Sequence, residues 1–201
     1  QLKRKIALKL PRMVWADDLA TRMARERDIL GALEHPNIAR LYDAGVDDKG
    51  RPYLALEYVE GQRIDAYCDA RCLTIRQRIE LFLQVLAAVQ YAHVNLVVHR
   101  DIKPANVLIN QQGAAKLLDF GIARLEVDAR MLEELGDVAQ TSTRAMTPRY
   151  ASPEQVRGER LSLVSDVYSL GVLLYELLTG RSPYHLRNDS RAALEIAVTE
   201  G

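Results

Sequence analysis

The chain has 201 residues, of which 48% are hydrophobic and 27% charged, a composition typical of a globular protein with a sizeable core. Its 27 basic and 27 acidic side chains cancel, so no net charge would draw it onto nucleic acid or an anionic membrane. No stretch approaches the ~20 apolar residues that cross a bilayer. We therefore expect no nucleic-acid partner, no membrane contact from this segment, and a cytoplasmic setting.

The first sixty residues alternate between strand patterns and one helical pattern. Short apolar runs bounded by proline, glycine and polar turns predict strands, and apolar residues recurring every three to four positions predict a helix. In chain order these are a strand over 4–10, a helix over 17–33, and strands over 38–46 and 51–59. This part is small and rich in strands.

The residues after Gly61 have a mainly helical character. An amphipathic pattern predicts a long helix over 75–94, and an apolar stretch over 166–179 predicts another that Gly180 ends. Between them, runs at 107–109 and 114–118 flank a polar turn and predict a hairpin. Residues 125–149 form a polar stretch long enough for a functional loop. We predict two parts, 1–60 and 61–201, with a ligand cleft at their junction.

Two short motifs carry the chemistry. The first, His99-Arg100-Asp101-Ile102-Lys103-Pro104-Ala105-Asn106, places a carboxylate, a cation and an amide within six residues. The second, Asp119-Phe120-Gly121, adds a carboxylate beside a flexible glycine. Phosphoryl transfer needs a group that orients the hydroxyl, oxygen ligands for Mg²⁺, and positive charge on the phosphates. The two motifs together supply all three.

In residue type and in order, these motifs resemble the catalytic loop and the magnesium-binding triplet of eukaryotic-type protein kinases, in a bacterial-like style. The resemblance implies an α+β, bilobal kinase fold with a small antiparallel-sheet N-lobe and a mainly helical C-lobe, and it implies ATP and Mg²⁺ as cofactors. Asp101 would accept or orient the substrate hydroxyl proton, and Lys103 would neutralise charge on the transferred phosphoryl group. Asn106 and Asp119 would bind magnesium.

The resemblance extends to the nucleotide site. Lys9, at the end of the first strand, looks like the lysine that contacts the α- and β-phosphates, and Glu26 on the following helix would be its ion-pair partner. The stretch Leu54-Ala55-Leu56-Glu57-Tyr58-Val59 resembles the hinge, where backbone groups of Glu57 and Val59 would bind the adenine edge. Ala7 and Leu108 would lie above and below the ring, although plain core packing explains these two residues equally well.

The stretch Thr147-Pro148-Arg149-Tyr150-Ala151-Ser152-Pro153-Glu154 looks like the end of an activation segment. Together with Lys103, Thr147 is the pattern of serine/threonine enzymes. Asp166 would anchor the catalytic loop by accepting backbone hydrogen bonds. Arg100 suggests control by phosphorylation of the loop, with Thr141, Ser142 and Thr143 as acceptors; a merely solvated loop is the alternative.

The chain also departs from the family pattern. No glycine precedes Gly31, so the glycine-rich loop over the phosphates is missing from this sequence, as are the final helices of the C-lobe and their arginine partner for Glu154. We therefore expect a catalytic-domain fragment with an uncompensated Glu154, from a parent that is anchored at the cytoplasmic face of the membrane in many bacterial relatives.

Three functions compete. A serine/threonine kinase would act on a protein substrate, and a homodimer for autophosphorylation is among the partners considered. A pseudokinase or regulatory binding module would keep the fold without turnover; intact Lys9, Asp101, Asn106 and Asp119 argue against it. A small-molecule kinase of the aminoglycoside phosphotransferase type would lack the peptide platform that the stretch 147–154 resembles.

Overall fold

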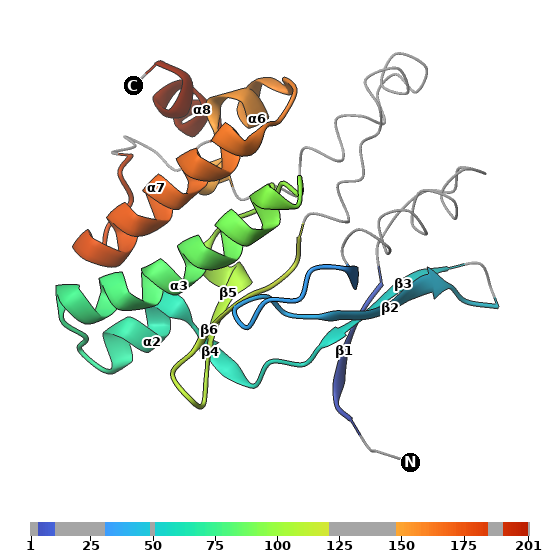
Figure 1. Cartoon of the computed structure of the whole chain (residues 1–201). Coiled ribbons are helices and arrows are strands. Elements are labelled where there is room, and N and C mark those ends of the chain that lie inside the picture. Colours follow the sequence, from blue (N-terminus) through green and yellow to red (C-terminus); the bar gives the residue numbers. More distant parts are fainter. Residues whose placement is uncertain (1–3, 11–30, 49–50, 121–147, 185–190, 201) are drawn as a thin grey trace. The chain divides into compact units, whose positions relative to one another are not determined.

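A computed structural model describes residues 4–10, 31–48, 51–120, 148–184 and 191–200 (Figure 1). The chain divides into two compact units: the first holds residues 1–99 and 104–123, and the second holds 100–103 and 124–201. The predicted boundary near residue 60 stays a prediction. The predicted helix over 17–33 and most of the loop over 125–149 lie outside the described residues.

One sheet of the first unit contains the strands predicted in the first sixty residues. It comprises β1 (Ile6–Lys9), β2 (Leu41–Val46) and β3 (Pro52–Glu57), all antiparallel in the order β1-β3-β2. Leu54 on the central strand is only 1% exposed, and the register places Lys9 opposite it. The sheet therefore places Lys9 opposite the buried centre of β3.

A second sheet in the same unit contains the predicted hairpin. It has the order β4-β5-β6, with β4 at Gly61–Arg63, β5 at Val107–Asn110 and β6 at Ala115–Leu117. The helical character predicted after Gly61 begins at Ile64, since residues 61–63 form β4 and pair with β5 before α2 (Ile64–Ala70) begins. Glycine permits this pairing, since a Cβ at Gly61 would lie 2.4 Å from the Ile109 carbonyl oxygen.

Helix α3 (Ile75–Val94) has the bounds that its periodicity predicts. Thr74 caps it: the Thr74 side chain accepts from the Gln77 backbone N–H, and the Gln77 side chain accepts from the Thr74 backbone N–H. The helix packs on β6, and its Gln84 side chain accepts a hydrogen bond from the Ala115 N–H at 2.9 Å. Helix and hairpin are thus joined by apolar packing and by a polar contact.

The second unit is helical in the part of it that the structure describes. It contains η4 (Pro148–Tyr150), α6 (Pro153–Arg157), α7 (Leu163–Thr179) and α8 (Arg191–Glu200), and α8 contacts both α6 and η4 (Figure 1). Helix α7 ends at Gly180, whose φ of +69° is left-handed, as predicted. It begins earlier than predicted because Ser162 caps it, which puts Asp166 inside its first turn.

Candidate active site

Asn106 and Asp119 lie at the open end of the β5–β6 hairpin. Asn106 ends the short 3-10 helix η1 (Pro104–Asn106), and Val107 pairs with Leu117, so the residues that precede β5 and follow β6 come together. The Leu118 N–H donates to the Asn106 carbonyl oxygen at 2.8 Å. Pairing within one hairpin therefore brings together the two residues that are predicted to bind magnesium.

His99 holds the chain just before and after Asp119. Its ring is fully buried, and Nε2 donates to the Leu118 carbonyl oxygen at 2.8 Å. The ring also packs against Phe120, with 4.7 Å between the ring centroids. Asp119 itself has a φ of +53°, a left-handed conformation that aspartate tolerates better than most residues. His99 was not among the predicted site residues.

Lys9 contacts the same aspartate. Its Nζ lies 3.2 Å from Asp119 Oδ1, with side chains 33% and 36% exposed. An ion pair this accessible contributes at most about 1 kcal/mol, so a phosphate or a metal ion can replace either partner at small cost. The predicted partner of Lys9, Glu26, lies outside the described residues.

The residues predicted to bind adenine are spread over both sheets of the first unit. Ala7 lies in β1 opposite Leu56, Glu57 ends β3, and Leu108 lies in β5. Ala7, Val59 and Leu108 are all half-buried, neither sealed in the core nor fully exposed. Their contact with a base stays a prediction. The Glu57 side chain also forms an ion pair with Lys116, which was not predicted from the sequence.

The loop over 100–103 belongs to the second unit. Lys103 Nζ lies 2.8 Å from Asp101 Oδ2, with side chains 18% and 26% exposed. Asp101 and Lys103 therefore pair with one another, as do Asp119 and Lys9 in the first unit. The predicted convergence of these two pairs on one triphosphate stays a prediction.

Two buried side chains fix the backbone of this loop. Asp166, 1% exposed, accepts a hydrogen bond from the Arg100 N–H at 2.8 Å, which confirms the predicted anchor. Gln155 Nε2 donates to the Arg100 carbonyl oxygen at 2.7 Å, a contact the sequence analysis did not predict. Together they hold Arg100 at a φ of +69°, immediately before Asp101.

Glu154 has a different environment from the one predicted. It is half-buried and accepts a hydrogen bond from the Ser165 hydroxyl, so the prediction of an uncompensated carboxylate is wrong. Burial raises the pKa of Glu154, but hydrogen bonds from Ser165, its own backbone and Ser152 outweigh burial and leave the pKa below its ordinary value of 4.5. Glu154 is therefore stabilised as a carboxylate.

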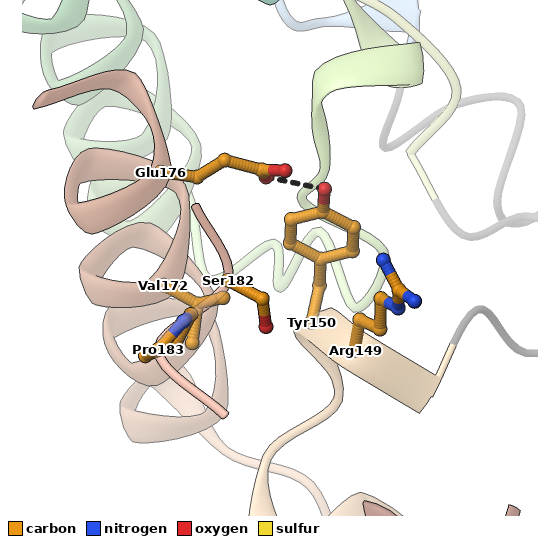
Figure 2. Close-up of a pocket in the computed structure, with 6 residues that line it drawn as sticks. All are labelled: Arg149, Tyr150, Val172, Glu176, Ser182 and Pro183. Atoms are coloured by element: carbon orange, nitrogen blue, oxygen red, sulfur yellow. Dashed lines mark hydrogen bonds between the residues drawn. The ribbon is translucent and has the colours of Figure 1, made fainter. Parts of the chain in front are cut away.

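A small pocket in the second unit contains none of the predicted site residues. Its lining comprises Arg149, Tyr150, Val172, Glu176, Ser182 and Pro183 (Figure 2). The Tyr150 hydroxyl points to Glu176 and donates to its carboxylate (Figure 2). Ser169 Oγ donates to the Tyr150 carbonyl oxygen at 2.7 Å, so polar contacts to α7 hold this pocket together.

The predicted residues of the activation segment are not all described. Thr147 and the predicted phosphorylation sites Thr141, Ser142 and Thr143 lie outside the described residues.

The donor chemistry of the hairpin suits magnesium bound to a nucleotide. Within the described residues, no three histidine, cysteine or acidic side chains gather into a metal site. Mg²⁺ commonly binds through one or two protein oxygens and completes its octahedron with phosphate oxygens and water. One amide and one carboxylate, beside the Lys9 ammonium, fit a metal that arrives with a triphosphate.

Comparison with known proteins identifies the family. The protein kinase domain family matches residues 2–199, so the chain belongs to the protein kinase family. The serine/threonine-protein kinase PrkC of Bacillus subtilis is 38% identical over 202 residues, 98% of this chain and 29% of that protein. The probable serine/threonine-protein kinase SCO3848 of Streptomyces coelicolor is 40% identical over 190 residues, 92% of this chain and 28% of that protein.

A third relative gives the same result. The serine/threonine-protein kinase PknB of Mycobacterium tuberculosis is 38% identical over 190 residues, 92% of this chain and 30% of that protein. The chain therefore spans less than a third of the length of these relatives. No helix among the described residues combines the length and the apolar character needed to cross a membrane.

Proposed function

We propose that this chain transfers the γ-phosphate of ATP to serine or threonine hydroxyls of a protein substrate. The observation that carries the proposal is the group at the open end of the hairpin, where Lys9 lies 3.2 Å from Asp119 and the backbones of Asn106 and Leu118 are hydrogen-bonded. The similarity to named serine/threonine kinases supports the same reaction. We place the reaction in the cytoplasm, which supplies ATP.

Each site residue has a role in this proposal. Asn106 and Asp119 would hold Mg²⁺, which supplies charge neutralisation on the phosphates when bound. Lys9 would leave Asp119 to contact the α- and β-phosphates. Asp101 would orient the substrate hydroxyl and accept its proton, and Lys103 would stabilise charge on the transferred phosphoryl group. Glu26 would orient Lys9.

The adenine would lie between apolar side chains and a backbone edge. Ala7 and Leu108 would contact its two faces, and backbone groups of Glu57 and Val59 would bind its polar edge. Burial of a flat apolar ring with a few hydrogen bonds at its edge is the common pattern for such ligands. Neither nucleic acid nor a membrane takes part in the proposal.

Incorporation of labelled phosphate from γ-labelled ATP into a generic basic protein tests the function. The Asp101→Asn variant keeps the size of the side chain and removes its basicity, so we expect incorporation to fall by about 100-fold or more. Asp65→Asn, which removes the charge of a half-buried carboxylate on α2 that pairs with Arg63 of β4, is the matched control and should retain full incorporation.

The outcomes separate the competing functions. Equal incorporation by the wild-type chain and Asp101→Asn would defeat the catalytic assignment. Nucleotide binding without incorporation by the wild-type chain would favour the pseudokinase alternative. Phosphorylation of a small aminoglycoside in place of protein would favour the small-molecule alternative.

A further inference from the structure

A half-buried ion pair joins the two sheets of the first unit. Lys116 on β6 contacts both carboxylate oxygens of Glu57, at the end of β3, with Nζ 2.9 Å from Oε1 and 3.0 Å from Oε2. Its side chain is 16% exposed and that of Glu57 is 26% exposed. Contact with both oxygens restrains the Glu57 side chain more than a single contact would.

The loop over 35–40 strengthens this connection on the Glu57 side. The Arg40 N–H donates to Glu57 Oε2 at 3.2 Å, and the Glu57 N–H donates to the Arg40 carbonyl oxygen at 2.8 Å. Lys116 Nζ also lies 3.5 Å from the Ile38 carbonyl oxygen. Glu57 is therefore held through its backbone and its side chain at once.

The same loop is bonded to β6. The Ala39 N–H donates to the Leu117 carbonyl oxygen at 2.9 Å, and the Leu117 N–H donates to the Asn37 carbonyl oxygen at 2.7 Å. Asp119 follows β6 after one residue. One hydrogen-bonded network therefore includes Glu57, at the end of β3, and β6, the strand that leads to the candidate magnesium ligand Asp119.

This network lies where the proposed nucleotide site needs precise spacing. The two predicted adenine contacts, Ala7 and Leu108, belong to different sheets, and the predicted edge contacts begin at Glu57. A ligand that touches both sheets requires a fixed distance between them. Because the network ties β3 to β6, it sets that distance before any nucleotide arrives.

We propose that Lys116 is a positioning residue for nucleotide binding, which acts by clamping Glu57 and thereby fixing one sheet against the other. The inference rests on the proposed function. It assigns Lys116 no contact with the nucleotide or with the reacting atoms. Loss of its charge should weaken nucleotide binding and leave the phosphoryl-transfer step nearly unchanged.

Titration of the chain with magnesium and a fluorescent ATP analogue, together with steady-state kinetics, tests this inference. For Lys116→Met we expect Kd and the KM for ATP to rise about tenfold, in line with the loss of a charge-assisted contact, and kcat to stay within about twofold. Lys116→Arg keeps the charge and should restore most of the affinity. Glu57→Gln, which has the same shape as glutamate, should weaken binding as Lys116→Met does.

The matched control is another ion pair of the same unit. Arg76 pairs with Glu80 on the exposed side of α3, so Arg76→Met removes an accessible ion pair that takes no part in the network and should leave Kd unchanged. The double variant Lys116→Met with Glu57→Gln should bind no more weakly than either single variant, because both remove the same interaction. If Lys116→Met fails to fold, Glu57→Gln and the Arg rescue decide the matter.

Two results would overturn the inference. One is a Lys116→Met or Glu57→Gln protein that is folded and binds the nucleotide as tightly as wild type. The other is a fall in kcat with no change in KM, which would make Lys116 part of the chemical step. A wild-type chain that binds no magnesium nucleotide would instead contradict the proposed function itself.

Discussion

His35 is the residue whose titration reports most directly on the network around Lys116. Its Nδ1 accepts a hydrogen bond from the Asn37 N–H at 3.1 Å, which requires that nitrogen to be unprotonated. Burial lowers the pKa of His35 from its ordinary value of 6.5, and the positive charge of Lys116 lowers it further. The folded chain therefore favours the neutral ring.

The sign of the pH effect follows from this shift. The unfolded chain binds a proton at His35 near pH 6.5 while the folded chain does not, so the free energy of unfolding falls as the pH drops below that value. We expect a nuclear magnetic resonance titration to give a His35 pKa below 6.5. In Lys116→Met the pKa should move up towards that value, and a His35 pKa at or above it in the wild-type chain would contradict the prediction.

At the residue scale, the sequence predicts which residues form the site better than it predicts which residues they contact. The motifs single out Asp101, Asn106 and Asp119, and the Asp166 anchor is confirmed. The partner of Lys9 among the described residues, Asp119, is 110 positions further along the chain and was not predicted. Such contacts depend on how two sheets meet, and residue spacing does not contain that information.

Gly61 governs the attachment of β4 to β5. A Cβ at this position would lie 2.4 Å from the Ile109 carbonyl oxygen and 2.9 Å from its carbon, both backbone atoms that cannot rotate away. We expect Gly61→Ala to push the strands apart and to lower the free energy of unfolding by about 2 kcal/mol. Urea unfolding at neutral pH measures the change.

The control for this prediction is a glycine with open space around it. Among the described residues, no atom lies within 4 Å of a Cβ at Gly31, so Gly31→Ala should change stability by no more than about 0.5 kcal/mol. Equal effects of the two substitutions would show that the close approach of β4 to β5 does not limit stability.

At the element scale, long periodic patterns are the most informative. Helix α3 has its predicted bounds because apolar residues recur at helical spacing along it and Thr74 marks its start, although its buried face covers only Leu81 to Ala92. Strand β4 was missed because Gly61–Arg63 is polar and exposed, and only pairing with β5 makes it a strand. The start of α7 was predicted too late because Ser162, which caps the helix, lies ahead of the apolar stretch from which the helix was predicted.

At the scale of the whole molecule, the predicted site residues divide between the two units. Lys9, Asn106 and Asp119 belong to the first unit, and Asp101 and Lys103 belong to the second. Family resemblance predicts that they act on one triphosphate, but pattern and spacing alone do not. The nucleotide-binding half of the site is therefore testable without reference to the second unit.

Hydrogen exchange with and without magnesium ATP provides that test. A ligand at 100 times its Kd stabilises the folded state by about 2.7 kcal/mol, so exchange that requires unfolding of the first unit should slow by about 100-fold. We expect this protection over β1 and over residues 106–118, where the Leu118 N–H donates to Asn106. The measurement is mass spectrometry of peptides after timed exchange.

Magnesium should be required for most of this protection, because without the metal ion the negative charge of Asp119 would repel the triphosphate. ATP with a chelator should therefore protect weakly, and Asp119→Asn should respond little to added magnesium. Equal protection with and without magnesium in the wild-type chain would rule out a metal at Asn106 and Asp119. Protection that is absent from β1 would rule out Lys9 as a phosphate contact, whatever the activity of the chain.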